Sequence, residues 1–107
     1  MPHPELEKIT KICKALSDPT RLRIFLFLAE RTLCVNAIVS FLDISQPAVS
    51  QHLKILREAD LVRAERRGYW MHYSANVGKI GEFTHILSKI IKGKKEKAPT
   101  QEITSGS

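Results

Sequence analysis

Apolar residues recur every three or four positions along most of the chain, which is the spacing of amphipathic helices. The pattern predicts helices over residues 5–16, 19–30, 35–42, 46–59 and 77–91. The second helix is apolar on nearly every side from Leu22 to Ala29, so we expect it at the centre of the core. Residues 31–34 read as a short connector or strand. On either side of Arg67-Gly68 the apolar period changes to about two, which predicts a β-hairpin.

Capping and turn residues divide these helices. Asp18 and Pro19 suit the N-cap and first turn of the second helix, and Ser45 and Pro47 suit the same positions of the fourth. Only residues 43–45 separate the third helix from the fourth, and such a spacing is typical of a helix-turn-helix. The hairpin that follows would be its wing. The expected fold is mostly α with a small β-hairpin, a winged helix-turn-helix in the order α-α-α-α-β-β-α.

Apolar stripes on the first and last helices favour a homodimer, because a free monomer would expose them as a patch. The first helix is expected to turn inward Leu6, Ile9, Cys13 and Leu16. The third helix is expected to turn inward Val35, Ile38, Val39 and Leu42. The last helix aligns Ile80, Phe83, Leu87, Ile90 and Ile91, and Lys92-Gly93 is expected to end it. The alternative is that the terminal stripes only cover the core of their own subunit.

Length and charge narrow the class of protein. The 107 residues predict one domain over 5–91, with a flexible N-terminus at 1–4 and a disordered basic and polar tail at 92–107. The net charge of +6 favours a polyanionic partner, although charge alone does not separate DNA from RNA or an anionic membrane. The longest apolar run, at 24–29, is too short to span a membrane, and the N-terminus lacks the apolar stretch of a signal peptide. We therefore expect a cytoplasmic protein with no membrane partner.

The fourth helix has one apolar side and one short polar side. Val49, Leu53 and Leu56 cluster on the side expected to face the core. The opposite side presents Gln46, Pro47, Ser50, Gln51 and Lys54. Glutamine can pair bidentately with adenine, serine can bond a base edge, and lysine can reach a phosphate. This side is predicted to read the major groove of double-stranded DNA; the alternative is an ordinary solvent face.

The predicted wing adds cations at its tip. Arg66, Arg67 and Gly68 would place two positive charges at the hairpin turn, where they could reach the DNA backbone or the minor groove. Trp70 and Tyr73 are expected in the core of the wing rather than as a stacking platform. His52, His72 and His3 are expected to be structural or solvated.

Three stretches of sequence resemble the ArsR/SmtB family of winged-helix transcriptional repressors. They are KALSDPTRLRIFLFL, SQPAVSQHLKILREADLV and RAERRGYWMHYS, which with their flanking helices cover most of residues 9–75. The resemblance implies a homodimer built from the first and last helices. It also implies that the dimer blocks a DNA operator and leaves when an effector binds. By motif position it makes Gln46, Ser50 and Gln51 the base readers.

The resemblance says less about the effector site, because the metal-binding residues depart from the family pattern. Metal-sensing members often carry Cys-Val-Cys at the start of the third helix, whereas this chain has Asn36 in place of the second cysteine. Asparagine is a poor ligand for a soft metalloid. His85 and Glu82 on the last helix lack the paired spacing of a zinc site. The metal is therefore unknown. One option is a thiophilic metal or metalloid at Cys34, but the sequence does not require any bound metal.

Cys13 and Cys34 could instead sense oxidants. Cys34 begins a helix, where the dipole favours the thiolate, whereas Cys13 is expected to be a small core residue. If the two met, within or across subunits, they could form a two-thiolate site or a switchable disulfide. The alternative function is a winged-helix regulator without metal sensing, acting as a redox switch or a protein-interaction module. An enzyme is not expected, since no catalytic motif surrounds Cys34 or any histidine.

Overall fold

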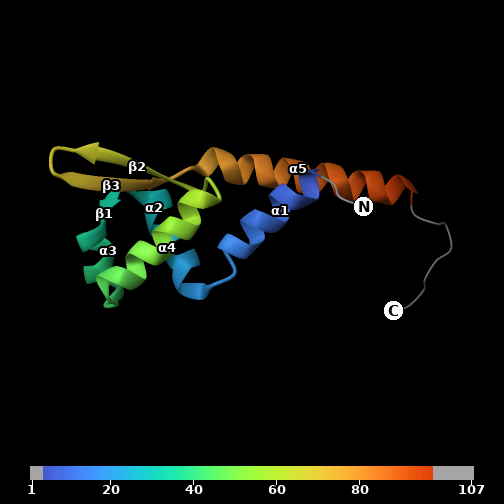
Figure 1. The fold of residues 1–107 in the computed structure, drawn as a ribbon. Coiled ribbons are helices and arrows are strands. Elements are labelled where there is room, and N and C mark those ends of the chain that lie inside the picture. The colour runs from blue at the N-terminus through green and yellow to red at the C-terminus, as the bar shows by residue number, and fades with distance from the viewer. Residues whose placement is uncertain (1–3, 98–107) are drawn as a thin grey trace.

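The computed structural model describes residues 4–97 (Figure 1). Its elements are α1 (Pro4–Ala15), α2 (Pro19–Glu30), β1 (Leu33–Cys34), α3 (Val35–Leu42), α4 (Gln46–Glu58), β2 (Val62–Arg67), β3 (Trp70–Ala75) and α5 (Val77–Lys97). The predicted order of helices and hairpin is confirmed, and the connector after α2 contains a two-residue strand. None of the helices within the described range is long and apolar enough to cross a membrane.

The core lies where α2, α3 and α4 meet the base of the hairpin. Its most deeply buried side chains come from each of these elements, namely Ile24, Ile38, Val49, Leu53, Leu56 and Leu61. Burying one such aliphatic side chain contributes roughly 1.5–3 kcal/mol relative to leaving it exposed. The predicted inward side of the fourth helix is therefore confirmed, and packing of that side fixes which side of α4 faces solvent.

The three strands form one antiparallel sheet in the order β1-β3-β2. Tyr73 of β3 lies opposite Leu33 of β1 and Ala64 of β2. The next row aligns Cys34, His72 and Glu65. Because successive side chains of a strand alternate between faces, these two rows lie on opposite faces of the sheet. The short β1 strand thus ties the beginning of α3 to the wing.

Helices α1 and α5 pack together at the other end of the molecule from α3 and the wing (Figure 1). Two ion pairs join them, Lys89 Nζ to Glu5 Oε2 at 3.0 Å and Lys8 Nζ to Glu82 Oε2 at 4.0 Å. Such exposed pairs each contribute about 1 kcal/mol or less. The contact between the two helices therefore depends mainly on their apolar side chains.

The apolar stripe of α1 differs from the one predicted. Ile9, Ile12 and Ala15 are its buried residues, whereas Leu6 is 47% exposed and Cys13 is exposed. The prediction that Cys13 points inward is therefore wrong. Apolar residues cover a broad arc of this helix, and after Ile9 the buried stripe runs through Ile12 and Ala15, each one position earlier than the predicted Cys13 and Leu16.

The last helix is longer than predicted. It continues through Lys92 and Gly93 to Lys97, so the expected end at residues 92–93 is wrong and the first six residues of the predicted tail are helical. A single glycine costs a helix only about 1 kcal/mol relative to alanine, which does not suffice to end it. Its buried residue is Ile86, and Leu87 and Ile91 are exposed. The rest of the predicted tail, 98–107, and residues 1–3 lie outside the described range.

Two further predictions of burial need correction. Helix α2 buries Ile24, Phe25 and Leu28, but Leu26 is 53% exposed, so this helix has one open apolar side instead of being enclosed. Trp70 is 55% exposed and does not belong to the core of the wing, whereas Tyr73 packs against the core as expected. Both differences arise because apolar character alone does not say which neighbours are present to cover a residue.

Candidate DNA-binding surface

The turn before α4 fixes the direction of that helix. Asp43 ends α3 in the left-handed conformation (φ 55°, ψ 46°), and its N–H donates to the Val39 carbonyl at 2.8 Å. Ser45 then caps α4, because its hydroxyl accepts a hydrogen bond from the Ala48 N–H at 3.2 Å. Pro47 occupies the first turn, where a missing N–H costs nothing. These contacts confirm the predicted caps and hold the start of α4 at the surface.

All five residues expected on the polar side of α4 are exposed, namely Gln46, Pro47, Ser50, Gln51 and Lys54. The opposite side of the helix is anchored by buried Val49, Leu53 and Leu56. Short amide and hydroxyl groups therefore stand on a rigid, well-packed helix. Such groups can form paired hydrogen bonds with base edges, and a helix of this width fits the major groove.

A small polar network joins α4 to the start of α2. Asp18 accepts a hydrogen bond from the Arg21 N–H at 2.9 Å, and this backbone contact is the main reason that the pKa of the Asp18 carboxyl lies below its ordinary value of 3.8. His52 contributes further, with its Nε2 3.9 Å from Asp18 Oδ2. The His52 Nδ1 lies 3.3 Å from an Arg21 guanidinium nitrogen, and Arg21 Nε donates to the Ala15 carbonyl at 2.6 Å. His52 is thus a structural residue, as predicted.

The wing tip is open to solvent and cationic. Gly68 has φ +65°, a conformation that favours glycine, and it separates exposed Arg66 and Arg67 from Tyr69. A guanidinium nitrogen of Arg67 lies 3.2 Å from Glu65 Oε1, so this arginine would exchange an internal carboxylate for another anion on binding. Tyr69 is 95% exposed, a feature that the sequence pattern did not predict because turn residues give no periodic signal.

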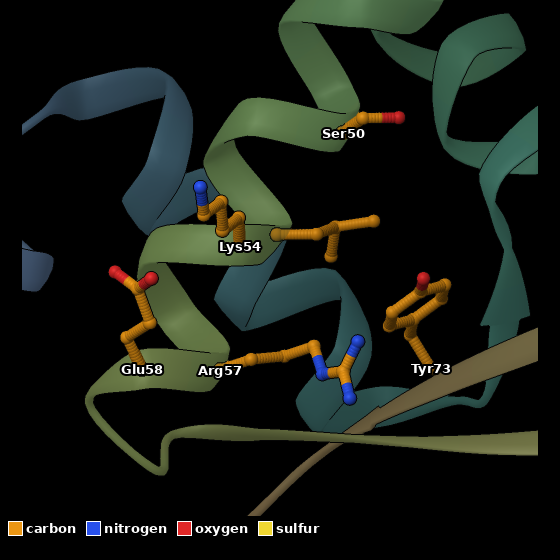
Figure 2. Close-up of a pocket in the computed structure, with 6 residues that line it drawn as sticks. Ser50, Lys54, Arg57, Glu58 and Tyr73 are labelled. Carbon is orange, nitrogen blue, oxygen red and sulfur yellow. The ribbon is translucent and has the colours of Figure 1, made fainter.

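A cleft of about 350 Å³ lies between α4 and β3. Its lining residues are Ser50, Leu53, Lys54, Arg57, Glu58 and Tyr73. Figure 2 shows the Arg57 guanidinium and the Tyr73 hydroxyl on the same side of α4 as the Ser50 hydroxyl, with Lys54 and Glu58 on the other side. Arg57 and Tyr73 were absent from the predicted site. Their convergence depends on the packing of α4 against the sheet, which no local sequence pattern reveals.

The two cysteines are not brought together within the subunit. Both thiols are free, Cys13 exposed on α1 and Cys34 half-buried at the N-cap of α3. Figure 1 shows α1 and β1 at different ends of the core. Among the described side chains, those of residues 4–93, there is also no group of three or more His, Cys, Asp or Glu residues that could hold a metal ion. A metal site with three ligands from one chain therefore does not fit the described residues.

Comparison with known proteins places this arrangement in a class. The solved structure of an ArsR-like transcriptional regulator from Rhodococcus sp. RHA1 superposes with a TM-score of 0.78, at 22% identity, over 92% of this chain and 100% of that one. A Mycobacterium bovis domain described as a homodimeric winged helix-turn-helix DNA-binding domain gives a TM-score of 0.67 at 23% identity, over 92% and 90% of the two chains. The fold is therefore a winged helix-turn-helix.

Sequence relatives narrow the class to a family. The family model for bacterial regulatory proteins of the arsR family matches residues 18–64. An uncharacterized HTH-type transcriptional regulator of Methanocaldococcus jannaschii is 38% identical over 78% of this chain and 96% of its own length. The arsenical resistance operon repressor of Escherichia coli is 45% identical over 59% of this chain, which spans about half (55%) of that repressor. The chain belongs to the ArsR family, and it is a DNA-binding transcriptional repressor.

Proposed function

We propose that the chain represses transcription by binding a DNA operator as a homodimer, with α4 in the major groove. Gln46, Ser50 and Gln51 read base edges, and Pro47 contacts the DNA at the start of the helix. Lys54 and the wing residues Arg66, Arg67 and Gly68 contact the backbone or the minor groove. The observation that carries the proposal is the exposed amide and hydroxyl side of α4, held rigidly by a buried apolar side.

The terminal helices support the dimer in this proposal. Leu6 on α1 and Leu87 and Ile91 on α5 are exposed apolar side chains on the two helices that pack together outside the helix-turn-helix. A second copy would cover them. Twofold symmetry then presents two α4 helices to half-sites about 34 Å apart, or a multiple of that distance.

The function is tested by selecting bound duplexes from a random-sequence pool with the full chain, then measuring affinity for the selected and for random DNA. We expect Gln51→Ala to lose about 1–3 kcal/mol on the selected duplex and much less on random DNA, because only the former uses the base contact. Equal losses on both duplexes would contradict base reading by Gln51. Failure of the wild-type protein to enrich any sequence would contradict the repressor proposal itself.

The effector is proposed to act at Cys34. This thiol sits at the N-cap of α3 and makes no capping hydrogen bond, and its strand partner His72 belongs to the wing. A peroxide would convert the thiol to a sulfenic acid and release water, which adds a polar atom at the junction of α3 and the wing. A thiophilic metal or metalloid remains the competing effector, and it would need ligands from a second chain.

Cysteine substitutions test whether the effector acts at Cys34 alone. We expect Cys34→Ser to abolish release from DNA by the effective agent among arsenite, cadmium and peroxide, while Cys13→Ser retains it. Loss of release in both variants would instead indicate a site shared between Cys13 of one subunit and Cys34 of the other. If the variant that carries both Cys13→Ser and Cys34→Ser is still released from DNA by the effective agent, the thiols sense nothing. A winged-helix regulator controlled by protein contacts then becomes the better description.

A further inference from the structure

The cleft between α4 and β3 is suited to an anion. Arg57 is the cation that faces the shared space, because Lys54 lies with Glu58 on the other side of α4, and Arg57 is not ion-paired with any side chain of residues 4–93. Figure 2 shows the donors of Arg57, Tyr73 and Ser50 on one side of the helix and the Glu58 carboxylate on the other. The carboxylate is therefore not aimed at the space that these donors share.

The floor and walls of the cleft hold these donors in place. Leu53 is 2% exposed and lines the cleft without any polar atom. Half-buried Tyr73 packs against the core and lies in register between Leu33 and Ala64. An apolar floor lowers the local dielectric, which strengthens a hydrogen bond to a charged group. Arg57 itself is exposed, so its guanidinium is available to an incoming ligand.

We propose that this cleft binds one backbone phosphate of the operator in each half-site, with the Arg57 guanidinium and the Tyr73 hydroxyl as its donors. The inference rests on the function proposed above. A helix in the major groove is bordered by sugar-phosphate strands, and a wing beside it reaches across the nearer strand. That strand passes between α4 and the wing, where the cleft lies. Arg57 and Tyr73 thus fix the depth and angle of α4, and the amides of its first turns read the bases.

The inference is tested on the full chain with the selected duplex, in which single phosphates are replaced in turn by uncharged methylphosphonates. For the wild-type protein, several positions are expected to weaken binding, because Lys54 and the wing arginines also contact the backbone, and one further position in each half-site should do so about tenfold through Arg57, as loss of a hydrogen bond to a charged group does. In Arg57→Ala the same replacement should have no further effect. In this variant the slope of log affinity against log salt concentration, the salt slope, should also become shallower by about 2 per dimer, since each phosphate contact contributes about 0.9.

Two matched variants separate a phosphate contact from general effects. Tyr73→Phe keeps the packed ring and removes only the hydroxyl, so it should weaken selected and random DNA alike by a few-fold at an unchanged salt slope. Arg63→Ala removes the same charge as Arg57→Ala, but from the face of the sheet opposite Tyr73. It should remain as sensitive as the wild type to the identified methylphosphonate.

Other outcomes would overturn the inference while leaving the repressor function intact. If Arg57→Ala binds the selected duplex but is weakened by every methylphosphonate as much as the wild type, no phosphate occupies the cleft. A second outcome combines two results. Inorganic phosphate without DNA shifts the Tyr73 ring signals in NMR saturably, and Arg57→Ala removes this shift, but no methylphosphonate loses its effect in Arg57→Ala. The occupant of the cleft is then a free phosphorylated molecule. If the wild-type protein selects no duplex, the repressor proposal fails first.

Discussion

At the scale of single residues, the polar contact between Asp18, Arg21 and His52 connects the start of α2 to the middle of α4. The hydrogen bond from the Arg21 N–H lowers the pKa of Asp18 in the folded state, with His52 and the Arg21 charge adding to it. Glu82 behaves similarly at the surface of α5, where Lys79 donates a hydrogen bond at 3.1 Å and lowers the pKa of that carboxyl. Both carboxylates therefore stabilise the fold only while they are ionised.

Asp18→Asn should make the stability of the folded protein decrease less steeply as the pH is lowered. A carboxyl whose pKa is lowered by folding stabilises the native state above its unfolded pKa of roughly 4, and that contribution is lost as pH falls through the folded value. Asparagine retains the capping oxygen but cannot titrate. Melting temperatures measured between neutral pH and strong acid should thus decline less steeply in the variant. A further decrease in slope is expected when Glu82→Gln is added, and an acid limb identical to that of the wild type would contradict the assignment.

Much of the α4 surface could be predicted at this scale, but not the burial of the outer helices. The apolar triplet Val49, Leu53 and Leu56 left only one side of α4 for solvent, so the exposed residues followed directly. In α1, by contrast, two overlapping stripes were available, and the one containing Ile12 rather than Cys13 is buried. Periodicity identifies an amphipathic helix, but it does not choose between adjacent stripes when both are apolar.

At the scale of elements, caps and turns made the boundaries predictable. Asp18 and Ser45 both accept the capping hydrogen bonds expected of them, and the helices they begin start where predicted. The end of α5 could not be predicted from Gly93, because one glycine is a small cost against a long series of helical hydrogen bonds. The cleft beside Tyr73 needed the packing of α4 on the sheet, which is a relation between elements and has no local signature.

Two glycine substitutions should change stability in opposite directions. Gly68 has φ +65° and open space where a Cβ would lie, so Gly68→Ala should cost about 1–2 kcal/mol through backbone strain alone. Gly81 lies in the interior of α5, also with open space, so Gly81→Ala should stabilise the chain by up to about 1 kcal/mol. Urea denaturation monitored by circular dichroism measures both changes. A neutral Gly68→Ala would show that the wing turn can adopt another conformation.

At the scale of the whole molecule, the helix-turn-helix and the pair formed by α1 and α5 extend toward different ends of the molecule (Figure 1), and Ile12 and Ala15 of α1 join them in one core. The first presents polar groups, and the second presents uncovered apolar side chains at Leu6, Leu87 and Ile91. In the proposed dimer, this division lets one part bind DNA and the other part bind a second copy. Occupancy of two half-sites at once then raises the operator affinity well above that of one subunit.

Leu6→Glu combined with Ile91→Glu should produce monomers that fold but bind the selected duplex much more weakly. Charges at both positions would have to be buried without partners in the interface, at a cost of several kcal/mol. Size-exclusion chromatography with light scattering measures the mass, and thermal melting checks the fold. Phe41→Ser is the control, since Phe41 is 55% exposed on α3 and lies away from the terminal helices. A double variant with the mass of a dimer would place the interface elsewhere.

The strand order β1-β3-β2 has one more consequence. Because β3 is central, β2 is an outer strand, and its far side has no partner strand within residues 4–97. Bare strand edges recruit strands from other molecules and so begin aggregates. Here the outer strand carries Arg63, Glu65, Arg66 and Arg67. Copies that approach one another along this border meet a row of charged groups, which opposes edge-to-edge stacking of strands.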